Sequence, residues 1–205
     1  MTGASGRLIA RLPFRAGALT GAAAYLLGYL LTYLLTVSRV RSELSRMNVD
    51  ATLSLLGGSG VAPWKVTGWF FYGAHFVDVS VTSSAMDLST DVVEVSAGGW
   101  RTLLFALPPL LLLVAGALAA HRAGARRVSI AAAAGGTILP GYFALAFVGV
   151  FLTQVTVLIA AVGPNLTPAL VAGVGYPLVF GPLGGAVLVA VQRSRARSSP
   201  HDSKP

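Results

Sequence analysis

Hydrophobic and polar positions fall into long, separate blocks along the chain. Four apolar runs without Asp, Glu, Lys, Arg or His take up most of the 205 residues: Ala16 to Val37, Thr102 to Ala120, Val128 to Val162, and Pro168 to Val191. A hydrocarbon layer of about 30 Å requires about 20 apolar residues in an α-helix. The first, second and fourth runs are therefore each predicted to cross a bilayer once.

The third run is longer than one crossing needs. As a straight helix it would reach roughly 50 Å, which is too long for one untilted span and too short for two spans and a turn. Gly135, Gly136, Pro140 and Gly141 lie within it, and both residue types weaken or bend a helix. We predict one kinked crossing, so the expected fold is an all-α integral membrane protein with four transmembrane helices.

The predicted organisation places a small extracytoplasmic segment between helices 1 and 2. In residue numbers it runs: cytoplasmic N-terminus 1–15, helix 16–37, extracytoplasmic segment 38–101, helix 102–120, cytoplasmic loop 121–127, kinked helix 128–162, outer turn 163–167, helix 168–191 and cytoplasmic tail 192–205. The first apolar run is longer than the roughly 7 to 15 residues of a signal peptide. It is therefore predicted to be a retained anchor.

Basic residues next to the spans predict the orientation. They form three blocks: Arg7, Arg11 and Arg15; Arg122, Arg126 and Arg127; and Arg193, Arg195, Arg197 and Lys204. The positive-inside preference places all three in the cytoplasm, although Arg39 and Arg41, just outside helix 1, oppose it. We predict cytoplasmic termini in a cell membrane, with a net charge of +8 that suits a lipid bilayer with anionic headgroups. No nucleic-acid partner is expected, because the arginines do not alternate with aromatic residues.

Composition excludes a water-soluble protein. The chain is 55% hydrophobic and 11% charged, with a mean hydropathy of +0.74, against about a quarter charged in soluble domains. It has no cysteine, which excludes disulfides, a thiol nucleophile and thiolate metal sites.

A fifth crossing over Val66 to Met86 is the main alternative, because this stretch contains only one His and one Asp among charged residue types. Inserting it would move Arg122, Arg126 and Arg127 outside, against the charge rule. Four spans are favoured, and the stretch is left as interfacial or re-entrant.

The same stretch holds the densest aromatic cluster of the chain: Trp64, Trp69, Phe70, Tyr72, His75 and Phe76. At helical spacing, Trp69, Tyr72 and Phe76 would share a face. Tryptophan and tyrosine concentrate where membrane meets water, so an interfacial belt is predicted, with a lipid- or ligand-binding lid as the alternative. Val77, Val79 and Val81, and later Val92, Val93 and Val95, then alternate with polar residues, which predicts a short β-hairpin.

The motifs Trp64-Lys65, Gly68-Trp69-Phe70-Phe71-Tyr72 and Ala74-His75-Phe76-Val77, set between one apolar run and three more, resemble a family of small haloarchaeal membrane proteins of unknown function. Thirteen arginines against two lysines fit such a source. The resemblance implies an archaeal, halophilic cell membrane and transfers no catalytic residue.

Small residues recur at intervals of four in the first and last runs, where they let helix backbones approach closely in lipid. The predicted packing positions are Gly17, Gly21, Gly28, Gly173, Gly181 and Gly185. The polar groups expected within the spans are Tyr25, Tyr29, Tyr33 and Gln154. Hydrogen bonds between helices account for them, and a narrow polar pathway is the alternative.

No sequence motif specifies a reaction. His75 and Asp78 could share a metal, but two ligands fall short of the three or four of a zinc site, so no catalytic residue, no cofactor and no metal is predicted. The leading hypothesis is a non-enzymatic packing or partner subunit, paired with its own copies as a homo-oligomer or with another membrane subunit. A permease or channel component for a small or lipophilic solute is second. A membrane-bound enzyme using His75 is third.

Overall fold

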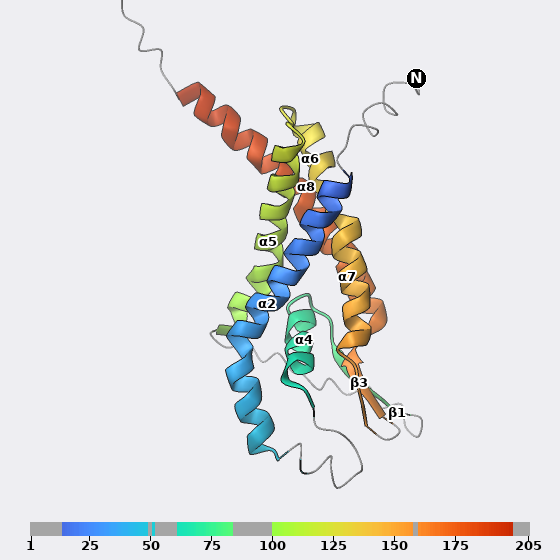
Figure 1. Cartoon of the computed structure of the whole chain (residues 1–205). Helices are drawn as coiled ribbons and strands as arrows, with labels where there is room; N and C mark the ends of the chain where they lie inside the picture. The colour runs from blue at the N-terminus through green and yellow to red at the C-terminus, as the bar shows by residue number, and fades with distance from the viewer. Residues whose placement is uncertain (1–13, 49–50, 52–60, 84–99, 158–159, 199–205) are drawn as a thin grey trace, which may run out of the picture.

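The computed structural model describes residues 14–48, 51, 61–83, 100–157 and 160–198. Its long helices form one bundle (Figure 1): α2 (Phe14–Arg46), α5 (Trp100–Arg122), the consecutive pair α6 (Val128–Gly136) and α7 (Leu139–Leu152), and α8 (Leu166–Ser198). With α6 and α7 taken together, four helices are long and apolar enough to cross a membrane. Each contains most of one apolar run of the sequence, although α2 continues to Arg46, beyond the end of its run at Val37.

The third apolar run is broken between Gly136 and Leu139, inside the glycine- and proline-containing stretch. The prediction that its helix continues to Val162 is wrong, because α7 ends at Leu152. The following residues form the strands β2 (Val155–Val157) and β3 (Ala160–Pro164), so the predicted turn over 163–167 is wrong as well. Val155, Thr156 and Val157 are β-branched and favour an extended backbone, and a neighbouring strand is present to pair with it.

The strand β3 pairs with β2 on one side and with β1 (Val79–Ser83) on the other, so the three strands form an antiparallel sheet in the order β1-β3-β2. Val79 lies opposite Pro164, and Val155 lies opposite Val162. The sequence correctly indicated an extended segment near Val79 but not its partner, which comes from about 80 residues further along the chain. The predicted second strand around Val92 to Val95 lies outside the described residues. The fold is thus mostly helical with a small sheet.

A short helix, α4 (Pro63–Gly73), packs against α2 and does not cross the bundle. Thr67 Oγ1 lies 3.3 Å from Thr36 Oγ1, and further along α4 the hydroxyl of Tyr72 lies 3.1 Å from that of Tyr25. From Thr36 to Tyr25 is about 16 Å along α2, so α4 reaches deep into the bundle. The chain then turns and leaves as β1 at the end where α4 entered (Figure 1). We call residues 63–83 the α4–β1 hairpin.

The opposite end of the bundle collects the arginines. Arg122 Nη1 at the end of α5 donates to Thr20 Oγ1 near the start of α2, at 3.1 Å. Arg193 Nη2 on α8 donates to the backbone oxygen of Arg126, also at 3.1 Å. The helix directions therefore bring the described members of the three basic blocks to one end of the bundle, away from the α4–β1 hairpin (Figure 1).

Glycines mark where the helices approach most closely. A methyl group added at Gly17 or Gly21 would overlap Thr137 or Ile138, at the break between α6 and α7. At Gly185 it would overlap the backbone of Ala131, and at Gly181 it would crowd Gly135 and Ile138. Gly28 and Gly173 are less tightly enclosed, since an added methyl group would lie 3.1 Å from Phe71 or 3.2 Å from Ala146. Gly116, Gly141, Gly149 and Gly184, which the fourfold pattern missed, are as crowded as the first group.

Candidate functional site: a buried tyrosine and histidine cluster

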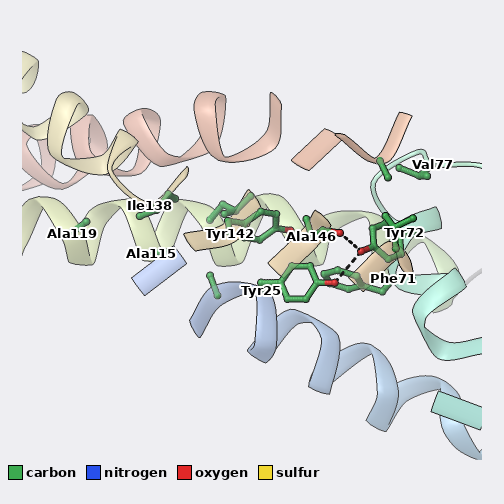
Figure 2. Close-up of a cluster of buried hydrophobic side chains, with 13 residues drawn as sticks. Tyr25, Phe71, Tyr72, Val77, Ala115, Ala119, Ile138, Tyr142 and Ala146 are labelled. Carbon is green, nitrogen blue, oxygen red and sulfur yellow. Dashed lines mark hydrogen bonds between the residues drawn. The ribbon is translucent and has the colours of Figure 1, made fainter. Parts of the chain in front are cut away.

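The inner end of the α4–β1 hairpin carries a polar cluster into the core of the bundle. Tyr72 and His75 come from the hairpin, Tyr25 comes from α2 and Tyr142 comes from α7; all four are buried. Figure 2 shows Tyr25, Tyr72 and Tyr142 among the apolar side chains of the core. Three separate segments of the chain therefore meet at one polar site.

The tyrosine hydroxyls form a chain whose direction can be assigned. Tyr72 Oη donates to the backbone oxygen of Ala146 at 2.5 Å, and a carbonyl can only accept. Because this bond uses the one hydroxyl proton of Tyr72, the bond between Tyr25 and Tyr72, at 3.1 Å, must be donated by Tyr25 (Figure 2). Tyr72 thus links α4 to both α2 and α7. Burial raises the pKa of Tyr72 well above its ordinary value, which keeps it a donor.

His75 is held at both ring nitrogens. Nδ1 lies 2.8 Å from the backbone oxygen of Phe71, and Nε2 lies 2.5 Å from the hydroxyl of Tyr142. Since the carbonyl only accepts, Nδ1 carries the proton and Nε2 accepts from Tyr142. The ring is neutral in this arrangement. Burial lowers the pKa of His75 to about 4, because a charged imidazolium would lose its hydration.

Aromatic rings surround this histidine. Its ring centroid lies 4.8 Å from that of Phe71 and 4.9 Å from that of Tyr176 on α8. Tyr25 in turn meets Phe71 and Tyr142 edge-on, at 5.0 and 5.5 Å. Edge-to-face pairs at such distances are favourable beyond the area that they bury. The polar groups therefore sit inside a rigid, largely apolar shell.

The space left in the cluster is very small. A cavity of about 10 Å³ is lined by the four polar residues, Phe71 and the small residues of α7 and α8 beside them. That volume is near the lower limit for a single water molecule. The cluster as it stands has no room for a solute larger than a water molecule.

The outer half of the hairpin is fixed by a second group of bonds. Trp69 Nε1 donates to the backbone oxygen of Thr153 at 2.9 Å, and Lys65 Nζ donates to that of Gln154 at 2.8 Å. These carbonyls follow the last turn of α7, where helix geometry leaves oxygens without partners. A lysine is also favoured there by the helix dipole. On the other side, Tyr29 donates to the backbone oxygen of Trp64 at 2.6 Å.

The predicted aromatic belt is only partly what the structure shows. Trp69 and Tyr72 are buried against protein, Phe70 is partly buried, and Trp64 and Phe76 are 41% and 72% exposed. The prediction that Trp69, Tyr72 and Phe76 share a helical face is wrong, because α4 ends at Gly73 and Phe76 has a left-handed backbone with a φ of 58°. Phe76 instead stacks on Phe105 of α5, with ring centroids 5.0 Å apart.

The polar residues expected inside the spans have different places. Tyr25 belongs to the buried cluster, Tyr29 lies at the outer half of the hairpin, and Tyr33 is only partly buried. Gln154 follows the end of α7 in the link to β2. The sequence placed every charged residue type outside the bundle, and this is wrong for His75, which is 5% exposed in the core. The residues around His75 in the sequence do not indicate that it is buried, because its burial results from the path of the hairpin into the bundle.

Tyr142 and Tyr176 were missed by sequence reasoning, although each is a hydroxyl group within an apolar run. That isolation was the available signal, since a hydroxyl in an apolar layer requires a partner. The structure also separates the two residues considered for a metal: both nitrogens of His75 are occupied, and Asp78 is exposed. Within the described ranges, no three His, Asp or Glu side chains are placed to hold a metal ion.

Comparison with known proteins gives one match. Residues 2–192 match the model of a family described as a family of unknown function (DUF7978). No curated protein and no solved structure matches the chain.

Proposed function

We propose that the protein is a non-enzymatic, multi-pass protein of the cell membrane that acts by packing with partner subunits or with its own copies. The chain belongs to a family of unknown function, so the proposal is argued from the structure. Four helices cross the bilayer, both termini are cytoplasmic, and the α4–β1 hairpin is re-entrant from the outer side. The archaeal, high-salt source implied by the sequence motifs remains a prediction.

The surface of the bundle supports a lipid environment. Large apolar side chains are exposed along every long helix, with exposed fractions of 62% to 71% for Leu19, Leu34, Leu103, Val114 and Val171. Such a surface is unfavourable in water and suits hydrocarbon. The segment after α4 is not helical, but the surrounding helices cover it, and a covered irregular backbone is compatible with a position inside the bilayer.

The proposal of a non-enzymatic function is supported mainly by the packing and hydrogen bonding of the core. Among the described residues, every buried side-chain nitrogen or oxygen has a hydrogen-bond partner. The buried tyrosine and histidine cluster encloses only about 10 Å³. A core that is fully paired and filled by its own side chains is built for rigidity and not for binding a substrate.

Solute flux into liposomes tests this proposal. The purified protein is reconstituted into vesicles loaded with ions or small neutral solutes, and protein-free vesicles serve as the control. We expect equal leakage in both. Reproducible solute movement by the wild-type protein alone would refute the packing function. Crosslinking in native membranes should then recover a defined partner subunit or a second copy of the chain.

A permease or channel component is the second candidate, and the re-entrant hairpin favours it. Irregular backbone and ionisable groups inside the bilayer often mark pathways for ions or protons. His75 lies at the inner turn of the hairpin. Proton uptake into vesicles, followed with a pH-sensitive dye, separates the two functions. A pathway through the cluster predicts uptake that is lost in His75→Gln and kept in His121→Gln, whose histidine is exposed at the basic end.

An enzyme using His75 with neighbouring acids is the least supported candidate. The imidazole is 5% exposed and both of its nitrogens are bonded within the protein. The nearest acid in sequence, Asp78, is exposed. A His75→Ala variant that keeps its fold and loses a cellular activity, without any change in partner binding, would revive this candidate.

A further inference from the structure

Within the part of the chain that the structure describes, the basic end of the bundle has no carboxylate. From Met1 to Val37 and from Trp100 to Arg197 the chain contains no Asp or Glu. Glu43 and Asp78, the carboxylates within the described residues, lie at the opposite end, and the described ion pair, Glu43 with Arg46, is there too. Among the described residues, no carboxylate lies beside Arg122, Arg126, Arg127 or Arg193, which favours an anion from outside the chain as their partner.

Four of these arginines are drawn together by the packing of α5, α6 and α8. Arg193 on α8 reaches the backbone of Arg126 in the link between α5 and α6, Arg127 is the next residue, and Arg122 lies on the last turn of α5. We call them the rim arginines; all four are exposed. The bond from Arg193 uses one of the five N–H donors of its guanidinium group. The others are available for a bidentate anion such as phosphate.

An exposed apolar side chain adjoins the same arginines. Val128 follows Arg127 and is 40% exposed, whereas Val187 and Val191, 55% and 41% exposed, lie on a different face of α8 from Arg193. The rim thus combines anion-binding groups with an adjoining apolar side chain. A free phosphate would use only the first of these, whereas a lipid would use both.

We propose that the rim arginines form a binding site for the phosphate headgroup of an anionic lipid of the inner leaflet, with an acyl chain lying along Val128. The site rests on the proposed membrane location, and it goes further by naming the residues and the lipid class. Each arginine near an anionic surface contributes to such binding. The site would fix the depth and tilt of α8 relative to the membrane surface.

Native mass spectrometry of the protein in a neutral detergent tests the site. The probes are phosphatidylglycerol, phosphatidylcholine and inorganic phosphate, each added at the same concentration. We expect retained phosphatidylglycerol and little retention of the other two. The triple variant Arg126→Gln, Arg127→Gln, Arg193→Gln should bind phosphatidylglycerol about tenfold or more weakly. The matched variant Arg39→Gln, Arg41→Gln, Arg46→Gln removes the same charge at the far end and should bind like wild type.

Equal retention of the two lipids, or equal loss of binding in both triple variants, would overturn the site. Competition by inorganic phosphate at the same concentration would show an anion site without lipid specificity and would also overturn it. If the rim variant does not fold, wild type at about 1 M salt, where charges are screened within about 3 Å, must lose phosphatidylglycerol for the proposal to stand. Failure of the membrane location is separate, because the protein would then stay monodisperse without detergent.

Discussion

Single hydroxyl and ring nitrogen atoms decide how the α4–β1 hairpin is held in the core. Tyr72 accepts from Tyr25 and donates to Ala146, and His75 accepts from Tyr142. Two of these bonds join the hairpin to α7 and one joins it to α2, and each can be removed by changing one side chain. The sequence could identify Tyr25 and Tyr72 as polar groups in apolar surroundings, but it could not pair them, because their partners are fixed by the hairpin's course.

Tyr72→Phe should destabilise the protein by about 1 to 3 kcal/mol, because it leaves the buried hydroxyl of Tyr25 without its acceptor. Tyr33→Phe removes the same atom from a partly exposed residue and should change stability by less than about 0.5 kcal/mol. Unfolding in detergent, followed by circular dichroism against denaturant, measures both. Equal effects of the two variants would contradict the assigned hydrogen bonds.

Acid should weaken the fold through His75. Its pKa is about 4 in the folded protein and 6.5 without burial, so the unfolded chain binds the extra proton between these values. The stability is therefore complete above about pH 6.5 and is lost as the pH falls toward 4, by about 3 kcal/mol in all. Unfolding midpoints at pH 7.5 and pH 5 measure the loss.

Substitution of two different histidines separates the effect of His75 from general acid sensitivity. His75→Gln should show a much flatter dependence of stability on pH over the same range. His121→Gln should keep the dependence of wild type, because His121 is exposed. If His121→Gln flattened the curve as well, the assignment to His75 would be wrong.

At the scale of elements, the sequence predicts which segments are helical but does not predict where each helix ends. Four apolar runs specify α2, α5, the α6 and α7 pair, and α8, and glycine with proline specifies the break near Gly136. The end of α7 at Leu152 was not predictable from hydropathy, because Val155 to Val162 is as apolar as the helix before it. Pairing with β1, a tertiary contact, makes that segment a sheet. The place of α4 inside the bundle has the same origin.

Two glycine variants test how closely the elements approach. Gly21→Ala should destabilise the protein by about 1 to 3 kcal/mol, because the added methyl overlaps the backbone of Ile138 in a packed core. Gly175→Ala, on α8, meets no atom within 4 Å and should be neutral or stabilising by up to about 1 kcal/mol through helix propensity. Thermal unfolding in detergent distinguishes them, and a neutral Gly21→Ala would show that α2 packs differently.

At the scale of the whole molecule, charge and topology agree. Helix directions place Arg122, Arg126 and Arg193 together at one end, and the α4–β1 hairpin and the sheet at the other (Figure 1). The sequence predicted the shared end of the arginines from the number of spans. It left the stretch from Val66 to Met86 open, since a helix of 11 residues followed by a strand has the same hydropathy as a span.

The lack of cysteine in the chain allows the topology to be tested with single added thiols. Arg126→Cys and Arg195→Cys should react with a membrane-impermeant maleimide from the same side of sealed vesicles. Trp64→Cys, near the start of α4, and Asp78→Cys, just before β1, replace exposed residues and should both react from the other side. Labelling of these two from opposite sides would show a fifth crossing in place of the re-entrant hairpin.

The pairing of β1 with β3 also has a consequence for the order of events during synthesis. Val79 meets Pro164, and α7, which receives Tyr72, begins only at Leu139. At about 5 to 20 residues per second, the ribosome needs several seconds between completing the first of these segments and supplying the second. In that interval residues 63–83 have neither their sheet neighbour nor their hydrogen-bond acceptor. The nascent protein should therefore be most vulnerable to quality-control proteases before its second half emerges.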